Sequence, residues 1–221
     1  MKTGQNYSDA GGSCNRLSAI DRFHVFLFWC SNKCQVRGLS VGILSFEDKA
    51  GRSLIRAKLE QALALIAEYS PLQYLRVRSD LARLFVFRIP HNLAEYHPQL
   101  HMCVFDCGYL QTTPPEELAM TIIHETMHAY LFRRGFVYDS TKRAQIERIC
   151  VRAEMAFAKR LPEGAAFAHD AAERLKYGDE FWSDDASLQR SLEGLRTLNS
   201  PSWYIRWVER RARRKWKTSK R

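Results

Sequence analysis

Two histidines four residues apart frame a glutamate in the stretch TIIHETMHAYLF, residues 121–132. On a helix, His124 and His128 project from the same face, at a separation that suits two imidazole nitrogens on one zinc ion. Glu125 lies one position further round, where its carboxylate could take a proton from a metal-bound water without binding the metal. The spacing therefore predicts a helix that holds Zn²⁺ and activates water.

The flanks of this motif are uncharged and favour one continuous helix. Thr113 can cap its start together with Glu116 three residues on. Pro114 suits the first helical position, and Gly135 can end the helix. The alternative is a core helix with two hydrogen-bonded histidines, but the glutamate would then need a partner of its own, because a buried charge is costly unless it is paired.

A catalytic zinc site has three protein ligands and an open position for water, so a third ligand is expected. A second helix, expected between residues 139 and 162, offers Glu147 and Glu154. Gly135 lies about 10 Å along the first helix from His128, and an antiparallel second helix returns that distance by Glu147. Glu154 lies two turns later and is the alternative ligand. The carboxylate that does not bind the metal could orient a histidine from behind.

The histidine pair and Glu147 follow the pattern HExxH, eighteen residues, Glu, over about residues 113–162. This arrangement resembles the gluzincin-type zinc metallopeptidases, in which the third ligand is a glutamate on a following helix. Metzincins, with a third histidine six residues after the second, are excluded because position 134 is Arg. The segment AEMAFAKRLP is similar to the ligand helix of ImmA/IrrE-type metallopeptidases. The segment HAYLF looks like the active helix of SprT-like proteases, whose third histidine and zinc ribbon are not evident.

The motif and the resemblance imply amide hydrolysis of a peptide or protein substrate. Zinc would polarise the substrate carbonyl and lower the pKa of its bound water to about 7, while Glu125 would carry the proton to the leaving amine. Tyr138 or Tyr109 could donate to the oxyanion. The alternative is a regulatory or binding protein on a zincin scaffold, as in ImmA/IrrE-type proteins.

The elements that must position these residues predict an α+β fold, a minimal zincin-like domain with a small mixed sheet packed on the active-site helix and the following ligand helix. Residues 23–30, 39–46, 82–90 and 101–110 are short, apolar and expected to form strands. Residues 51–70 place leucine and isoleucine on one face of a helix. Zincins bind substrate along an edge strand, for which residues 101–110 are the expected segment.

Composition divides the chain into three parts. Residues 1–20 are rich in Gly, Ser and Asn and are expected to be a poorly ordered lead-in. Residues 21–200 form the expected metallopeptidase domain, with one or two surface helices over 163–200. Residues 201–221 form a basic tail that contains tryptophan. With 46% hydrophobic and 26% charged residues, the chain fits a globular protein rather than a disordered or fibrous one.

The longest apolar run is far shorter than the roughly 20 residues of a membrane-spanning helix. The segment before it is long and polar, so a secretory signal is not expected. A cytoplasmic protein is therefore expected, with its six cysteines mostly reduced and buried. Cys30 with Cys34, and Cys103 with Cys107, repeat a C-x3-C spacing that could hold a structural zinc. Buried thiols are favoured over that site, because both pairs lie in apolar sequence.

The charge of the chain is concentrated in its tail. Residues 206–221 contain nine Lys or Arg and one Glu, a net +8 of the whole chain's +10. On a helix the tail would present a basic surface formed by Arg206, Arg210, Arg213 and Arg214. Such a surface could bind a nucleic-acid backbone, an anionic membrane or an acidic partner. The alternative is that Trp203 and Trp207 attach the helix to the body while the charges are only solvated.

Overall fold

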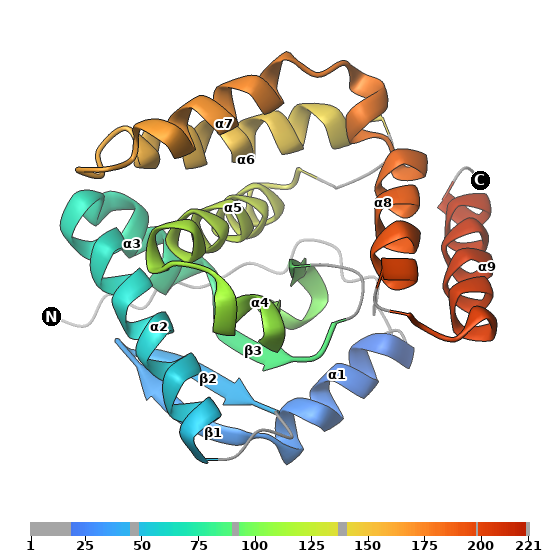
Figure 1. Cartoon of the computed structure of the whole chain (residues 1–221), viewed down its shortest axis with the longest axis horizontal. Coiled ribbons are helices and arrows are strands. Elements are labelled where there is room, and N and C mark those ends of the chain that lie inside the picture. Colours follow the sequence, from blue (N-terminus) through green and yellow to red (C-terminus); the bar gives the residue numbers. More distant parts are fainter. Residues whose placement is uncertain (1–18, 45–48, 90–92, 137–140, 198, 220–221) are drawn as a thin grey trace, which may run out of the picture.

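A five-stranded mixed sheet lies beneath the helices in the computed structural model of the chain (Figure 1). The structure describes residues 19–44, 49–89, 93–136, 141–197 and 199–219. The strands are β1 Asn32–Val36, β2 Leu39–Ile43, β3 Arg83–Phe87, β4 Ala94–His97 and β5 Met102–Asp106. Their order is β1-β2-β3-β5-β4, with three parallel central strands and an antiparallel strand at each edge. The α+β class is thereby confirmed for the described residues.

The first apolar run is a helix and not the predicted strand. α1 Ala19–Cys30 contains all of residues 23–30 and leaves Phe26 and Trp29 exposed, while Phe28 is buried against the sheet. An apolar run of eight residues fits a strand or a helix equally well, because its periodicity does not discriminate between them. The polar segment that follows forms strand β1 instead. β1 lies at the edge of the sheet and has few buried positions, so polar residues suit it.

A two-residue turn joins β1 to β2. Both of its residues have positive φ, 47° at Arg37 and 84° at Gly38, as a type I′ hairpin turn requires. β2 then leads through α2 Lys49–Tyr69 and α3 Pro71–Asp80 to the parallel strand β3. The helix predicted over residues 51–70 is confirmed in α2.

Both faces of the sheet are buried, and the side chains of the central strands β3 and β5 alternate between them. Leu84 and Phe105 join the large core beneath α2 and α5, whereas Phe85 and Val104 join the smaller core beneath α1. This alternation is the two-residue period of a strand. The strands predicted in residues 39–46, 82–90 and 101–110 are confirmed, although the last continues into the short helix α4 Cys107–Thr112.

Three helices lie in successive layers above the sheet (Figure 1). α5 Pro115–Arg133 packs on α2 and the sheet, α6 Arg143–Ala158 packs on α5, and α7 Ala165–Lys176 packs on α6. α5 is therefore covered around most of its circumference, and ten of its side chains are buried. The helix ends before Gly135, with a φ of 82°, as predicted. The predicted cap by Thr113 is wrong, because Pro114 takes the N-cap position and no side chain caps the helix.

The strand that borders α5 is β4, at the edge of the sheet. β5 lies between β3 and β4, so the expectation that residues 101–110 supply the edge strand is wrong. β4 pairs only with β5 and packs beside α5. The prediction chose β5 because it is the last strand before α5 in the chain, but the earlier strand β4 takes the outer position.

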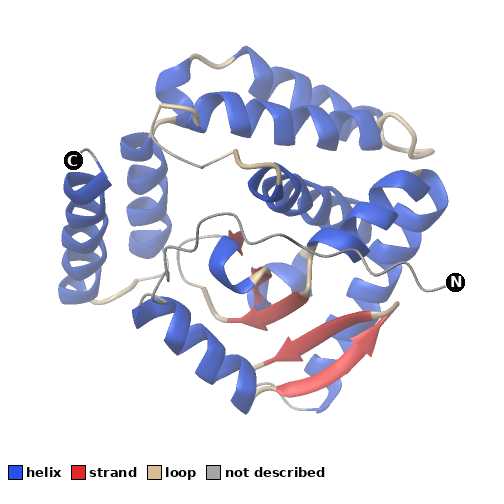
Figure 2. Cartoon of the chain, turned by 180° about the vertical axis from the view of Figure 1, so that it is seen from behind, coloured by secondary structure: helices blue, strands red, loops and turns tan. Residues whose placement is uncertain are grey.

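The remaining helices complete one side of the molecule (Figure 2). Two 3-10 turns, η1 Pro98–Leu100 and η2 Asp179–Trp182, precede β5 and α8. α8 Asp184–Thr197 packs against α9 Ser202–Ser219, which contains most of the predicted tail. Within the described residues, no helix combines the length and apolar composition needed to cross a membrane. Residues 1–18 of the predicted lead-in lie outside the described residues.

Candidate metal centre

α5 and α6 lie side by side and run antiparallel, which brings the histidine motif opposite the carboxylates of the next helix. His128, late in α5, lies near Glu147, early in α6, whereas the earlier His124 also reaches the later Glu154. The two imidazoles face one another, with 3.1 Å between their Nε2 atoms. The four-residue spacing therefore places both ring nitrogens at one point, as two ligands of one metal require.

Glu147 approaches this point from α6. Its Oε2 lies 3.3 Å from Nε2 of His124 and 3.8 Å from Nε2 of His128. Ligand atoms about 2.0 to 2.1 Å from a tetrahedral zinc ion lie about 3.3 Å from one another. The three distances between ligand atoms are 3.1, 3.3 and 3.8 Å, so these two imidazoles and one carboxylate could hold a metal ion.

Cys150 lies one turn after Glu147 on α6 and is fully buried. Its sulfur and one nitrogen of each of His124 and His128 lie within 4.8 Å of one another, so this His-His-Cys group could bind a metal ion. Cys150 is one of the six cysteines that were expected to be mostly reduced and buried, and it was not predicted to bind a metal. Its three-residue spacing from Glu147, which puts both side chains on one helix face, was the signal that could have identified it.

Glu154 lies on the far side of His124 from the Nε2 atoms. One of its oxygens pairs with Nδ1 of His124 and the other with the guanidinium of Arg174 on α7. Because a carboxylate only accepts hydrogen bonds, Nδ1 carries a hydrogen, and whenever the ring is neutral its lone pair is therefore on Nε2. Of the two predicted carboxylates, Glu147 thus faces the candidate metal position and Glu154 orients a histidine from behind.

The electrostatic environment differs between the two histidines. Burial, together with the charge of His124, lowers the pKa of His128 to about 4, which keeps its ring neutral. Burial opposes a positive charge on His124, yet the surrounding groups outweigh burial and raise its pKa well above the usual value. Those groups are Cys150, Glu154 and Glu147. The centre therefore stabilises positive charge where the two rings meet.

Glu125, adjacent to His124 on α5, faces the sheet edge at β4. Only 7% of the residue is exposed, and the backbone N–H of Tyr96 on β4 donates to its carboxylate. Burial raises the pKa of Glu125 to about 7, although the Tyr96 hydrogen bond acts in the opposite direction. The side chains of His124 and His128 are 17% and 14% exposed, so solvent reaches the centre.

Arg143 is a second residue near the histidines that was not predicted from the sequence. It lies one turn before Glu147 on α6, pairs with Asp184 at the start of α8, and contributes to the lowered pKa of His128. A cation near the histidines could stabilise negative charge on a reacting group. No sequence signal pointed to Arg143, because its partner comes from a helix forty-one residues later.

Of the two tyrosines proposed as oxyanion donors, the structure describes Tyr109. The hydroxyl of Tyr109 is 2.7 Å from Oγ1 of Thr121, one turn before His124 on α5. Tyr138 lies outside the described residues.

The other predicted sites are distant from this centre in the sequence. The five cysteines that the structure describes are free thiols, and among described residues neither C-x3-C pair gathers a third metal-binding side chain. Arg206, Arg210 and Arg213 are exposed on α9, whereas the side chain of Arg214 lies outside the described part.

No protein-family model, curated protein or solved structure matches the chain.

Replacing Glu154 should destabilise the metal-free protein. Glu154→Gln removes the buried carboxylate from both His124 and Arg174, and we expect the free energy of unfolding to fall by about 3 kcal/mol. The matched control is Asp170→Asn, which removes the exposed partner of the same guanidinium and should change stability by at most about 1 kcal/mol. Urea denaturation with a chelator present measures both. Equal losses in the two variants would contradict a structural role for the buried pair.

Proposed function

We propose that this chain is a zinc-dependent peptidase in which His124, His128 and Glu147 hold the metal and Glu125 is the general base. The observation that supports this proposal is the meeting of two imidazole Nε2 atoms and one carboxylate oxygen, 3.1 to 3.8 Å apart. Two nitrogen ligands and one oxygen ligand form a common set for catalytic zinc. The zincin-like fold belongs to the same proposal.

Bound zinc would supply a Lewis acid and a water that is acidic near neutral pH. The chain's own residues would orient the ligands and carry the proton. The hydrogen bond from Nδ1 of His124 to Glu154 holds that ring with Nε2 toward the metal position. Glu125, adjacent to His124 on α5, has a pKa of about 7 because it is buried, which suits a group that takes a proton and then releases it.

A peptide substrate would bind beside β4. Leu93 and Asp106 are a hydrogen-bonded pair, because the N–H of Asp106 donates to the carbonyl of Leu93. Hydrogen-bonded and non-hydrogen-bonded pairs alternate along two antiparallel strands, so the N–H and C=O of Tyr96, three residues later, point away from β5. The N–H of Tyr96 donates to Glu125, so this outer edge of the sheet borders the proposed base. An extended peptide added there would bring its backbone close to Glu125. Arg143 is the proposed donor to its carbonyl oxygen.

Cys150 supports a second candidate function. A thiolate is a strong zinc ligand, and with Glu147 and both histidines it would make four protein ligands, which is typical of a structural site. No position would then remain for water. The chain would in that case be a regulatory or binding protein on the same scaffold, with a metal that orders the α5–α6 pair and catalyses nothing.

The outward face of α9 is the second surface for which we propose a binding partner. Its aliphatic side chains, Ile205, Val208 and Ala212, pack on α8. Trp203 and Trp207 are 66% and 48% exposed on the other side. They lie among the exposed arginines 206, 210 and 213. Among the described side chains of this face, little apolar surface other than indole is left to enter a lipid bilayer. We therefore propose single-stranded nucleic acid as the partner, with bases stacked on the indoles and phosphates near the guanidinium groups.

Metal content and the effect of Cys150 test the first proposal against the second. The wild-type chain should bind one zinc ion, and His128→Ala should lose it, as measured by elemental analysis after dialysis. Cys150→Ser should retain the ion and the peptidase activity, because the thiol is not a ligand of the catalytic form. Loss of the ion in Cys150→Ser would favour the closed site with four protein ligands.

Removal of the general base should separate metal binding from hydrolysis. Glu125→Gln is expected to keep a full zinc complement and to lower kcat on a cleavable peptide by at least about a hundredfold, because general-base catalysis contributes that much. Glu117→Gln, on the same helix and two turns earlier, is the control and should keep wild-type activity. Activity in Glu125→Gln equal to wild type would exclude Glu125 as the base.

Binding of labelled oligothymidylate should depend on α9. Arg206→Gln/Arg210→Gln should weaken binding and reduce its salt dependence, because fewer counterions are released. Trp203→Ala/Trp207→Ala should weaken it by about tenfold or more through lost stacking. Fluorescence anisotropy measures both, with Arg22→Gln/Lys159→Gln as a control of equal charge change. Equal weakening in the control, or binding to anionic vesicles in preference to the oligonucleotide, would reject the proposal.

A further inference from the structure

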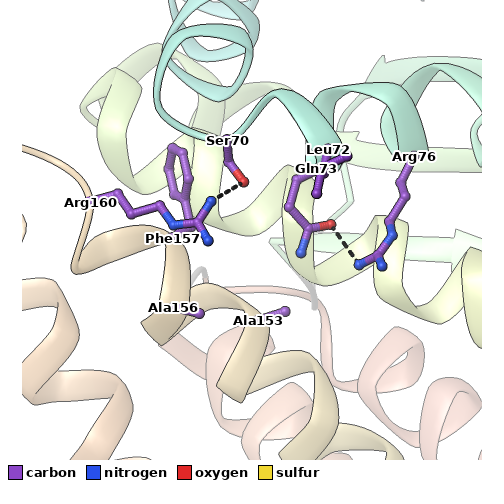
Figure 3. Close-up of a pocket in the computed structure, with 8 residues that line it drawn as sticks. All are labelled: Ser70, Leu72, Gln73, Arg76, Ala153, Ala156, Phe157 and Arg160. Atoms are coloured by element: carbon purple, nitrogen blue, oxygen red, sulfur yellow. Dashed lines mark hydrogen bonds between the residues drawn. The ribbon is translucent and has the colours of Figure 1, made fainter.

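A pocket lies between the start of α3 and the second half of α6 (Figure 3). Residues 70–76 line one side of it, and residues 153–160 line the other. The lining residues are Ser70, Leu72, Gln73, Arg76, Ala153, Ala156, Phe157 and Arg160. None of them belongs to the metal centre, and no carboxylate is among them.

The guanidinium groups of two arginines give this pocket a positive charge. Arg160 and Arg76 extend into the space between the helices from opposite sides, with Gln73 between them (Figure 3). Nη1 of Arg160 donates to the Ser70 hydroxyl at 3.0 Å, and Nη1 of Arg76 donates to the Gln73 amide oxygen at 3.4 Å. Both acceptors are neutral. Within the described ranges of the chain, neither arginine forms an ion pair.

The surrounding structure holds the arginines in place and adds to the positive potential. The guanidinium of Arg76 lies over the ring of Tyr130 on α5, 4.8 Å from the ring centre. Ser70 is the N-cap of α3, but its hydroxyl makes no capping hydrogen bond and accepts from Arg160 instead. The first N–H groups of α3 therefore keep their partial positive charge at the pocket wall.

The rest of the lining is apolar. Ala153, Ala156 and Phe157 form the α6 side, and Leu72 at the rim is 74% exposed. A fully hydrated inorganic ion would leave these surfaces unused. A ligand with one anionic group and a small apolar part would satisfy both the guanidinium groups and the apolar wall.

We propose that this pocket binds a small organic anion through a phosphate or carboxylate group held by Arg76 and Arg160, with its apolar part against Leu72 and the alanines of α6. The proposal concerns a second site and does not depend on the peptidase function. Arginine suits this role because its planar fork donates two parallel hydrogen bonds to an oxyanion.

Calorimetric titration of the full chain with phenyl phosphate, benzoate and inorganic phosphate tests the proposal. Phenyl phosphate or benzoate should bind more tightly than inorganic phosphate, because only the aromatic ligands use the apolar wall. Arg76→Gln and Arg160→Gln should each weaken binding by about tenfold or more, since each removes charged hydrogen bonds. Arg152→Gln, an exposed arginine of α6 outside the pocket, should bind as wild type does. Ala156→Phe, which fills the pocket without a change of charge, should also abolish binding.

Three results would overturn this assignment. The first is unchanged affinity in both pocket arginine variants, and the second is an equal loss in Arg152→Gln, which would indicate a general effect of net charge. The third is loss of binding in His128→Ala, which would place the anion on the metal instead. Circular dichroism of each variant separates a lost site from a lost fold.

Discussion

The side chain of His124 is held at both ring nitrogens, and the arrangement of the upper helices depends on that interaction. Glu154 accepts from Nδ1, and Glu147 lies 3.3 Å from Nε2. Both carboxylates come from α6, seven residues apart, so the ring fixes the register in which α6 lies on α5. Arg174 extends this chain of contacts to α7, and a buried carboxylate shared by two cationic partners is satisfied at both oxygens.

The burial of α5 makes this arrangement possible. α5 packs on α2 and the sheet below and on α6 above, so its polar motif is surrounded by apolar contacts. In such surroundings each polar group needs a defined partner, and each motif residue has one. α6 supplies Glu154 for His124 and Glu147 for His128, and the β4 backbone is the partner of Glu125. The same burial raises the pKa of Glu125 and lowers that of His128. The chemistry of the motif thus follows from its depth in the fold.

The arginine-lined surfaces lie apart from the carboxylates of the metal centre. At the centre, carboxylates surround the histidines, which favours a bound cation. The pocket between α3 and α6 has two arginines and no carboxylate, which favours an anion. On α9 the aliphatic side packs on α8 and the arginines face solvent. The metal centre, the pocket between α3 and α6, and the outward face of α9 are therefore separate sites. α6 contributes to the first two.

The sequence alone determined the features that local periodicity controls. The spacing of His124 and His128 defines one helix face, and counting along two antiparallel helices brought Glu147 level with them, because helical rise per residue is constant. Tertiary structure decided what depends on partners distant in the chain. Only packing showed that α1 is a helix, that β4 is the edge strand, that Glu154 lies behind His124 with Arg174, and that Cys150 and Arg143 lie at the centre. An apolar run or a lone carboxylate has several allowed surroundings, and non-local contacts select among them.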